Sequence, residues 1–391
     1  MPDTIGLILS LNKYLHMKIG IVCYPTFGGS GVVATELGKA LAAKGNKVHF
    51  ISYQQPFKLD LFSENIFYHE VKVTNYPLFD YQPYELVLTS KLVDVIKFEK
   101  LDLLHVHYAI PHASAAYMAQ HILQSEGINI PFITTLHGTD ITLVGKDKSF
   151  APVITFAINE SNIVTAVSES LKQDTLDHFN VKREIKVVPN FICFSDYENL
   201  GDIASIKKSF APNNEKILIH VSNFRKVKRV QDVFKVFIKV NEKIPAKLLL
   251  VGDGPERYQL EEFCRNQGVC DKVHFLGKLK DTERILSASD LFLLTSESES
   301  FGLAALEAMA AKVPVISSNT GGIPEVNKHG FSGYLSNVGD IDDMAKNALK
   351  ILSDDAVLKQ FKQNAYQQAK QFDIEKILPQ YEAIYKELIE K

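Results

Sequence analysis

The sequence predicts an α/β protein made of two doubly wound, parallel-sheet domains that face a central cleft. Three observations predict this fold class. Short apolar runs alternate along the chain with segments of helical spacing, which is typical of parallel sheets covered by helices on both faces. The 391 residues are too many for one typical core, so two domains are expected. Polar and turn residues gather between Pro189 and Pro212, where a second series of runs follows the first.

The first series predicts an N-terminal domain over residues 17–195, and residues 1–16 form a short extension ahead of Met17. A glycine-rich turn follows the first strand, and the next helix is predicted over Ser30–Ala43 with Ser30 as its N-cap. The predicted strands, each a short apolar run, are Lys18–Cys23, Val48–Ser52, Leu103–His107, Phe132–Leu136, Ile163–Val167 and Ile185–Val188.

The second series predicts a C-terminal domain over residues 196–372 with the same alternation. A helix of strong helix formers is predicted over Leu303–Ala311. A last helix, from about Ile374 to Lys391, occupies residues 373–391 and is expected to pack back on the N-terminal domain. The predicted strands are Lys216–Val221, Lys247–Val251, Val273–Leu276, Leu291–Leu294 and Val315–Ser318.

The composition argues against several classes of function. The chain is 46% hydrophobic and 23% charged, and its net charge of −3 gives no general attraction to nucleic acid or to an anionic membrane. No apolar run approaches the roughly 18 residues of a membrane span. The four cysteines are dispersed without a CxxC pair. We therefore expect a cytoplasmic protein with reduced thiols and no nucleic-acid or membrane partner.

The strongest site signal lies between a predicted strand and the helix that follows it. Glu299 falls on the turn after Leu291–Leu294, and Glu307 lies about two turns further along the helix. Ligands of open α/β sheets bind beyond the carboxyl ends of the strands, and the first amides of a helix attract phosphate. Two carboxylates for hydroxyl groups, beside amides for phosphate, predict a sugar-nucleotide site.

Polar residues also end strands in the N-terminal half. The glycines of Phe27–Gly31 let the backbone approach an anion, although a simple tight turn explains them too. His105, His107 and His112 surround another strand end, where Tyr108 is a candidate ligand contact. A metal site is disfavoured there because no carboxylate or cysteine accompanies the histidines, which favours cleft-lining or core histidines.

A third strand end carries Thr134–Asp140, with the sequence TTLHGTD. His137 could donate a hydrogen bond to a substrate oxygen, and Thr135 could donate one to a carboxylate. A capped turn explains Thr139 and Asp140 equally well.

In the C-terminal half, four cations crowd into Arg225–Arg229 directly after a predicted strand. A solvated basic turn is the plain alternative, but the strand-end position favours pyrophosphate binding. Gly252 and Gly277 end two further strands and could pass the backbone close to a flat base, and Thr320–Glu325 is another such loop. Turn chemistry explains each of these loops singly.

Together these motifs resemble those of the retaining glycosyltransferases of family 4, which have the GT-B fold of two Rossmann-like domains. The resemblance covers essentially the whole chain from Met17 onward. It rests on the E-x7-E spacing of Glu299 and Glu307 within SESESFGLAALEAMA, and on VGDGPE, FLGK and TGGIPE. Further segments resemble a malate-using subgroup: MKIGIVCYPTFGGSGVVATELGKALA, HVHYAIPHA, TTLHGTDIT, VPNF and HVSNFRKVKRVQDV.

The resemblance implies transfer of N-acetylglucosamine from UDP-N-acetylglucosamine (UDP-GlcNAc) to the hydroxyl of L-malate, the first step of bacillithiol biosynthesis. It also implies a retained α configuration, no essential metal or other cofactor, and a homodimer. Ser222 and Asn223 stand where most of the family carry Gly-Arg, a form shared by the subgroup. This departure leaves open whether Arg225 faces the diphosphate or the acceptor.

The resemblance also implies a role for each site residue, with Glu307 on the ribose hydroxyls and Glu299 on a sugar hydroxyl. No side chain is an obvious general base, and the donor phosphate is expected to take the acceptor proton. The expected catalytic residues are His137, Arg225, Lys228 and Glu299. Those expected to bind the donor are Gly28, Gly29, Gly252, Gly277, Lys278, Glu299, Phe301, Gly302, Leu303 and Glu307. Those expected to bind the acceptor are Ser30, Tyr108, Thr135, Asn190 and Arg225.

Three other functions stay open at this point. A family 4 enzyme could use a lipid or glycan acceptor at a membrane, although the basic cluster lies in the second domain. A nucleotide-sugar epimerase of similar fold would release UDP without any acceptor. Binding without catalysis is disfavoured by the intact pair of glutamates.

Overall fold

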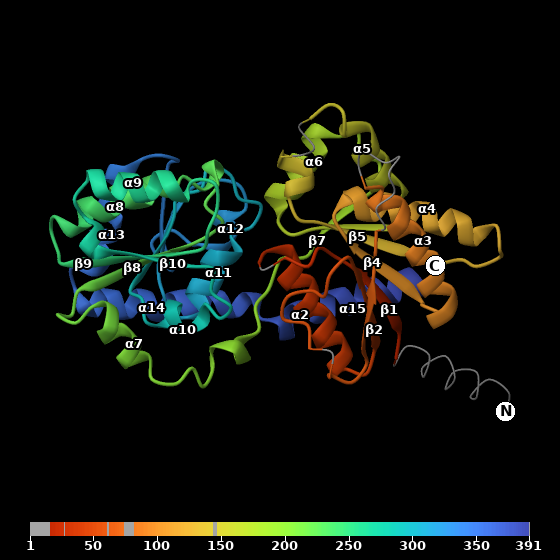
Figure 1. The fold of residues 1–391 in the computed structure, drawn as a ribbon, viewed down its shortest axis with the longest axis horizontal. Coiled ribbons are helices and arrows are strands. Elements are labelled where there is room, and N and C mark those ends of the chain that lie inside the picture. Colours follow the sequence, from red (N-terminus) through yellow and green to blue (C-terminus); the bar gives the residue numbers. More distant parts are fainter. Residues whose placement is uncertain (1–15, 27, 61, 74–81, 144–146, 391) are drawn as a thin grey trace. The chain divides into compact units, whose positions relative to one another are not determined.

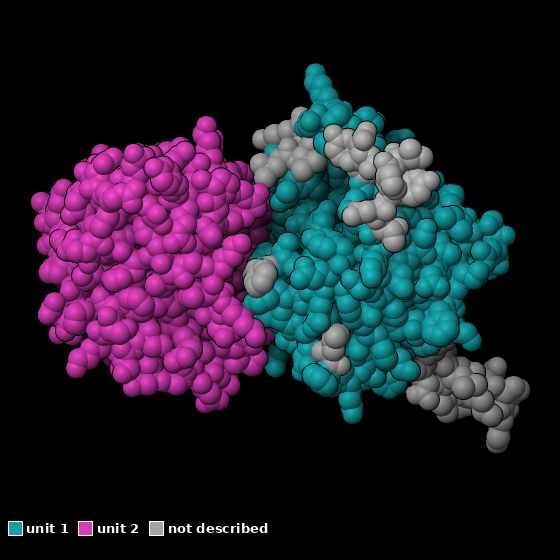
Figure 2. All heavy atoms as spheres, in the orientation of Figure 1, with its two compact units in different colours: residues 1–190, 374–391 teal, residues 191–373 magenta. Residues whose placement is uncertain are grey.

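The computed structural model describes residues 16–26, 28–60, 62–73, 82–143 and 147–390. Two compact units make up the chain, residues 1–190 with 374–391 (unit 1) and residues 191–373 (unit 2), which Figure 2 colours separately. Phe27, at the start of the predicted glycine-rich turn, and residues 1–15 of the predicted extension lie outside the described residues.

Unit 1 is built on a seven-stranded parallel sheet in the order β3-β2-β1-β4-β5-β6-β7 (Figure 1). Its strands are β1 (Lys18–Val22), β2 (Lys47–Ser52), β3 (Ile66–Glu70), β4 (Leu103–His107), β5 (Phe132–Leu136), β6 (Ile163–Ala166) and β7 (Ile185–Val187). Its helices are α2 (Ser30–Ala43), α3 (Tyr84–Glu99), α4 (Ser114–Gln124), α5 (Ala151–Glu160), α6 (Glu169–His178) and α15 (Ile374–Glu390), with the short turns η1 (Ala109–Ala113) and η2 (Thr139–Leu143).

Unit 2 is built on a six-stranded parallel sheet in the order β10-β9-β8-β11-β12-β13. Its strands are β8 (Lys216–Val221), β9 (Ala246–Val251), β10 (Val273–Gly277), β11 (Leu291–Leu294), β12 (Val315–Ser318) and β13 (Gly333–Ser336). Its α-helices are α7 (Ile203–Phe210), α8 (Val230–Asn241), α9 (Arg257–Asn266), α10 (Glu283–Ser287), α11 (Leu303–Ala310), α12 (Ile323–Val326), α13 (Ile341–Leu352) and α14 (Asp355–Ala369). Its short turns are η3 (Phe194–Tyr197), η4 (Lys226–Lys228), η5 (Cys270–Lys272) and η6 (Lys370–Phe372).

The predicted fold class is confirmed: both sheets are parallel and doubly wound. Every strand predicted from an apolar run forms, and each end lies within one residue of its predicted position. Two strands were missed, β3 and β13, and both lie at the edge of a sheet. In each the burial is mixed rather than continuous, because an edge strand packs against fewer neighbours, so no apolar run marks it.

The strand order fixes where ligand sites can lie. In unit 1 the order reverses between β1 and β4, and in unit 2 it reverses between β8 and β11. Loops that leave two such strands diverge to opposite faces of the sheet and open a crevice at their carboxyl ends. The segments after β1, β4, β8 and β11 are therefore the parts of the chain best placed to hold a ligand.

The C-terminal helix α15 belongs to unit 1, although unit 2 precedes it in the chain. Its Tyr381 and Tyr385 are fully buried, and Tyr385 Oη lies 2.7 Å from Nδ1 of His105 on β4. Burial raises the pKa of both tyrosines, which therefore stay neutral hydrogen-bonding groups. None of the helices in the described residues has the length and apolarity needed to cross a membrane.

Candidate active site

In the candidate site of unit 2, a charged pair and a backbone hydrogen bond join the loop after β8 to the loop after β11. Lys228 Nζ lies 2.5 Å from Glu299 Oε1, and Ser296 Oγ donates to the same oxygen at 3.0 Å. The backbone holds the loops together too, since the amide of Glu297 donates to the Val227 carbonyl at 2.8 Å. The two strand ends at the reversal point of this sheet are therefore fixed to each other by a charged pair.

The backbone of Glu299 rests on the glycine loop that follows β12. The amide of Gly322 donates to the Glu299 carbonyl at 2.9 Å. Gly321 has a φ of +54°, and a Cβ there would lie 2.0 Å from the Glu299 carbonyl oxygen. The loop requires glycine here because its backbone packs directly against the backbone of Glu299. The sequence alone did not distinguish this packing role from a ligand contact.

The start of α11 offers amides without a competing side chain. Its N-cap is Gly302, with φ +95°, and the helix has neither a side-chain cap nor an acidic residue in its first turn. Leu303 is its first residue, so the amides predicted to bind phosphate lie at an uncapped, positive helix end. The Phe301 side chain is buried and packs on Phe372 with ring centroids 5.6 Å apart, so only its backbone is available to a donor.

Glu307 lies on the same helix and is half-buried. Burial, with Glu307 and Glu283 close by, raises the pKa of Tyr197 well above its ordinary value. Glu307 on α11 and Glu283 on α10 therefore both lie close to Tyr197 on η3. Sequence reasoning missed Tyr197 and Glu283 because neither belongs to a motif at a strand end.

The predicted basic cluster divides into residues with different tasks. Arg229 has a structural role, because its guanidinium forms a hydrogen-bonded ion pair with Asp232 on α8. Arg225 is exposed, and its Nε donates at 2.9 Å to the Asn223 side-chain oxygen when that amide faces it. Lys228 pairs with Glu299. Of the cluster, Lys228 therefore pairs with a residue of the predicted site, while Arg225 lies at the surface beside Asn223.

The two glycines predicted to approach the base have different surroundings. A Cβ on Gly252 would lie 1.8 Å from the Ser222 carbonyl oxygen, so the close packing of two loops explains this glycine. Gly277, at φ +67°, faces open space, with Nη1 of Arg257 4.0 Å from the position of an added Cβ. Lys278 beside it is exposed. Arg257 therefore lies near Gly277, a neighbour that the sequence did not indicate.

In unit 1, Ser30 does not cap α2 as predicted. The N-cap is Gly29, whose φ of +62° and ψ of −132° suit only glycine, and no side chain caps this end. Ser30 is the first helical residue, and its Oγ lies 2.6 Å from Tyr108 Oη. A Cβ on Gly28 or Gly29 would meet nothing within 4 Å, so this backbone has space beside it. The prediction failed because the glycine conformation shifts the cap by one residue.

Tyr108 is held in a conformation that side chains rarely adopt, with φ +87°. Its amide donates to the Thr135 carbonyl at 2.9 Å, and its carbonyl accepts from the Ala113 amide at 3.3 Å. Strained residues of this kind persist only where the surrounding structure fixes them, and they concentrate at functional sites. The Tyr108 ring also packs against Tyr24, which follows β1, with ring centroids 5.4 Å apart, so Tyr108 links the ends of β1 and β4 at the reversal point of this sheet.

The Thr135 hydroxyl is fully enclosed, unlike that of Ser30. Its Oγ1 lies 2.7 Å from Nε2 of His105 and 2.7 Å from Oγ1 of Thr165. The Thr135 hydroxyl is thus hydrogen-bonded to other side chains of the sheet, and its position does not support the predicted contact with an acceptor. Asn190 is also buried, but its Oδ1 has no hydrogen-bond partner within the described residues.

His137 follows β5 and is tied to His107 at the end of β4, with His137 Nε2 2.7 Å from His107 Nδ1. Burial lowers the pKa of His137 to about 3, so the imidazole is neutral near pH 7. Asp140 joins the same two loops, because its carboxylate accepts from the amides of Ala109 at 2.9 Å and Gly138 at 3.2 Å. His137 is therefore held through its ring by His107, and its backbone also hydrogen-bonds to the Asp140 carboxylate.

The three histidines considered as metal ligands already have other partners. Both ring nitrogens of His105 are hydrogen-bonded, and Nδ1 of His112 donates to the His107 carbonyl. In the described residues, three potential ligands also gather at His49, His69 and Glu99. A metal on His49 Nδ1 would leave its Nε2–H buried without an acceptor, the opposite of a well-supported metal site.

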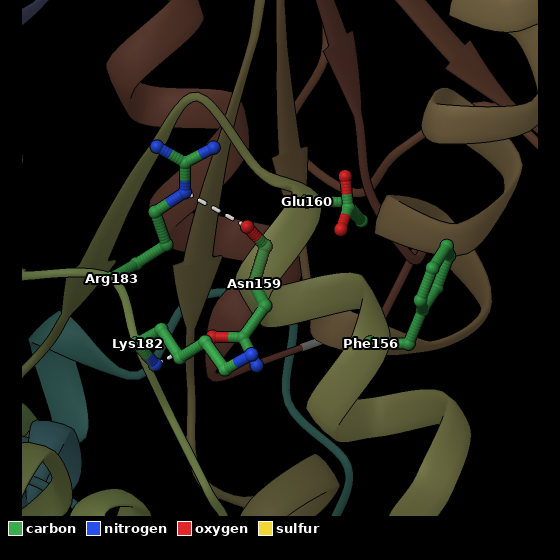
Figure 3. A pocket seen from close by; sticks show the side chains of 5 residues that line it. All are labelled: Phe156, Asn159, Glu160, Lys182 and Arg183. Atoms are coloured by element: carbon green, nitrogen blue, oxygen red, sulfur yellow. Dashed lines mark hydrogen bonds between the residues drawn. The ribbon is translucent and has the colours of Figure 1, made fainter.

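A hollow of about 420 Å³ lies elsewhere in unit 1 and is lined by Phe156, Asn159, Glu160, Lys182 and Arg183 (Figure 3). Arg183 Nε donates to the Asn159 carbonyl at 2.8 Å, as the figure shows. These residues end α5 and precede β7, so they lie at the amino ends of the strands. None of them is a predicted site residue, and this hollow is separate from the candidate site.

Comparison with known proteins decides the family. The model of Glycosyltransferase Family 4 matches residues 27–195, and that of Glycosyl transferases group 1 matches residues 202–368. A Bacillus anthracis protein named N-acetyl-alpha-D-glucosaminyl L-malate synthase is 48% identical over 377 residues, 96% of this chain and 98% of that protein. The chain belongs to glycosyltransferase family 4. An uncharacterized glycosyltransferase of Methanocaldococcus jannaschii is 28% identical over 86% of this chain and 90% of its own.

Solved structures give this family 4 glycosyltransferase the GT-B fold. Anabaena HepE, crystallised with UDP-glucose, superimposes with a TM-score of 0.81 at 23% identity, covering 95% of this chain and all of that one. A glycosyltransferase of Rickettsia africae has a TM-score of 0.78 at 21% identity over 96% and 99% of the two chains. At these identities the likeness concerns the fold.

The predicted site residues of the glycosyltransferase fall into two sets, one in each unit. In unit 2 the structure brings Lys228 to Glu299, and it places Glu307 on the helix that begins at Gly302. In unit 1 it brings Ser30 to Tyr108 and ties His137 to the end of β4. Gly252, Thr135 and the Phe301 side chain are instead engaged by packing or by hydrogen bonds within the fold.

Proposed function

We propose that this glycosyltransferase transfers N-acetylglucosamine from UDP-GlcNAc to the hydroxyl of L-malate. The observation that carries the proposal is the 48% identity to the B. anthracis protein named for that reaction, which extends over nearly the full length of both chains. The Ser222-Asn223 form after β8, which departs from most of the family, supports the same assignment.

In this proposal the donor is bound by unit 2. Glu307 accepts hydrogen bonds from the ribose hydroxyls, and Glu299 accepts one from a hydroxyl of the sugar. The amides at the start of α11 and the Lys228 ammonium neutralise the diphosphate. Gly277 and Lys278 contact uracil through the backbone, with the open space beside Gly277 as support. Gly28 and Gly29 of unit 1 contact the phosphates.

The reaction breaks the bond between the anomeric carbon and the diphosphate oxygen, and forms a bond from the same face to the malate hydroxyl oxygen. The hydroxyl proton passes to the departing phosphate, since no side chain of the predicted site serves as an evident base. Lys228 and Arg225 stabilise the negative charge that develops on the leaving group. Fixed charges aimed at developing charge commonly supply the largest part of catalysis.

The acceptor is bound by residues of unit 1 in this account. Ser30 and Tyr108 present hydroxyl groups at the reversal point of the sheet, and the buried Asn190 supplies a side-chain amide whose N–H can donate to a carboxylate. Arg225 supplies the positive charge that a dicarboxylate requires. Thr135 acts indirectly, because its carbonyl accepts from the Tyr108 amide.

Four further properties belong to the proposal: retention of the α configuration, no requirement for a metal or other cofactor, a homodimer, and a cytoplasmic location. Retention, metal independence and the dimer rest on the resemblance to the family. The cytoplasmic location rests on the four dispersed cysteines, among which the sequence has no CxxC pair. Product anomer, activity in excess chelator and mass in solution are the corresponding measurements.

A UDP-release assay with different acceptors tests the proposed reaction. UDP should appear with L-malate and not with lipid or glycan acceptors, and removal of divalent cations should leave the rate unchanged. Release with a lipid or glycan acceptor alone would favour the membrane-acting alternative. Release without any acceptor, together with an isomerised sugar, would favour the epimerase.

A further inference from the structure

One hydrogen bond joins two neutral histidines at adjacent strand ends in unit 1. His107 is the last residue of β4 and is fully buried, and His137 follows β5 and is half-buried. Nδ1 of His107 lies 2.7 Å from Nε2 of His137, with the ring planes inclined by 25°. Burial lowers the pKa of both groups, so each ring carries a single proton near pH 7. One nitrogen of the pair must therefore donate and the other accept.

The second nitrogen of each ring indicates which one donates. Nε2 of His107 is enclosed and has no hydrogen-bond partner among the described residues. If the His107 proton were on Nε2, an N–H group would be buried without an acceptor, and such orphaned donors are rarer in proteins than under-satisfied acceptors. If it is on Nδ1, that N–H donates to His137, and only a lone pair stays unpaired.

The second nitrogen of His137 is placed differently. Its Nδ1 has no hydrogen bond within the described residues, and the His137 side chain is only half-buried, whereas His107 is fully buried. When Nε2 of His137 accepts from His107, the only proton of the neutral ring lies on Nδ1. This N–H group is not used within the described residues and can donate to an oxygen of a bound substrate.

We propose that His107 is a positioning residue that donates through Nδ1–H to His137 Nε2 and so holds His137 as the Nδ1–H tautomer. The inference rests on the proposed function, because His137 is one of the expected catalytic residues and its expected task is to donate a hydrogen bond to a substrate oxygen. His107 itself touches no substrate. The His112 side chain supports it from behind by donating to the His107 carbonyl.

Three substitutions at His107 separate this role from simple packing. His107→Asn keeps an amide N–H near the position of Nδ1, His107→Gln moves it toward the position of Nε2, and His107→Leu removes it. We expect the Gln and Leu variants to lose about tenfold in kcat/KM for UDP-GlcNAc, the loss of roughly one hydrogen bond, and Asn to keep most of it. UDP affinity should stay unchanged in all three.

Nitrogen NMR of the free enzyme, labelled at histidine, tests the tautomer without any substrate. We expect His137 to show a protonated Nδ1 and a bare Nε2 in the wild type, and to change tautomer in His107→Leu. A protonated Nε2 on His137 in the wild type would overturn the proposal. Equal losses in Asn, Gln and Leu with an unchanged His137 spectrum would also overturn it, by showing that His107 only packs. Because the spectrum needs no turnover, failure of the proposed reaction is told apart from failure of this inference.

Discussion

Lys228 Nζ lies 2.5 Å from Glu299 Oε1, so the loop after β8 and the loop after β11 carry one charged pair at the reversal point of the unit 2 sheet. Both side chains are mostly buried, with exposed fractions of 20% for Lys228 and 15% for Glu299. In the proposed reaction the lysine faces diphosphate and the glutamate a sugar hydroxyl. The pair therefore keeps both groups in place before the donor arrives.

Glu299→Gln should lower kcat about a hundredfold or more while leaving the affinity for UDP within about threefold of wild type. The substitution removes a charged acceptor for the sugar and leaves Lys228 without its anionic partner, but it does not touch the nucleotide. Kinetics and UDP titration calorimetry measure the two effects. Glu297→Gln, an exposed neighbour with the same charge change, is the matched control and should behave as wild type. A large loss of UDP affinity in Glu299→Gln would contradict the assignment.

Glu307→Gln should show the complementary pattern. Since Glu307 is assigned to the ribose hydroxyls, its loss should weaken UDP and UDP-GlcNAc by similar factors, about tenfold each. Calorimetry with both ligands separates this from the Glu299 effect. If only UDP-GlcNAc weakened, Glu307 would belong to the sugar and the two roles would have to be exchanged.

Tyr108→Phe should raise the KM for L-malate about tenfold and leave the KM for UDP-GlcNAc nearly unchanged. The change removes the hydroxyl 2.6 Å from Ser30 Oγ but keeps the ring that fills the end of β4. Tyr117→Phe, on α4 away from the strand ends, is the control. Equal changes in both KM values would show that the pair supports the fold of the loop rather than the acceptor.

Asp140 should make stability fall as the pH rises from about 4 to about 6. Burial raises the pKa of this carboxyl to about 6 from an ordinary value of 3.8, so in that window the folded protein keeps a proton that the unfolded chain has released. These values bound the loss at about 3 kcal/mol. Urea unfolding across the window should give a flatter curve for Asp140→Asn, and an unaltered slope would contradict the assignment. The same variant should be less active, because an amide cannot accept both the Ala109 and Gly138 N–H bonds.

The sequence predicts the features of this molecule that depend on neighbouring residues in the chain better than those that depend on contacts between distant residues. Apolar runs predicted the parallel strands, and strand ends then predicted the loops that bear Lys228 and Glu299. The strand β3 could not be found in this way, because its exposed and half-buried side chains leave no apolar run. Ser30 was misjudged as a cap because the positive φ of Gly29 cannot be read from residue type alone.

The same limit explains the residues that were missed or reassigned. Tyr197 comes close to Glu307 and Glu283 only through tertiary packing, and no motif in the sequence marks it. Thr135 looked available because it ends a strand, but the hydroxyl points into a hydrogen-bond network with His105 and Thr165. Gly252 looked like a ligand contact, and its neighbour proved to be the backbone of Ser222.

The most direct test of the central claim is the mass and anomeric configuration of the product made from UDP-GlcNAc and a panel of hydroxy acids. The account predicts one new compound, formed with L-malate, whose mass is that of malate plus N-acetylglucosamine less one water, with the α linkage retained. Formation of UDP with no malate adduct, or of an adduct with the inverted linkage, would contradict it.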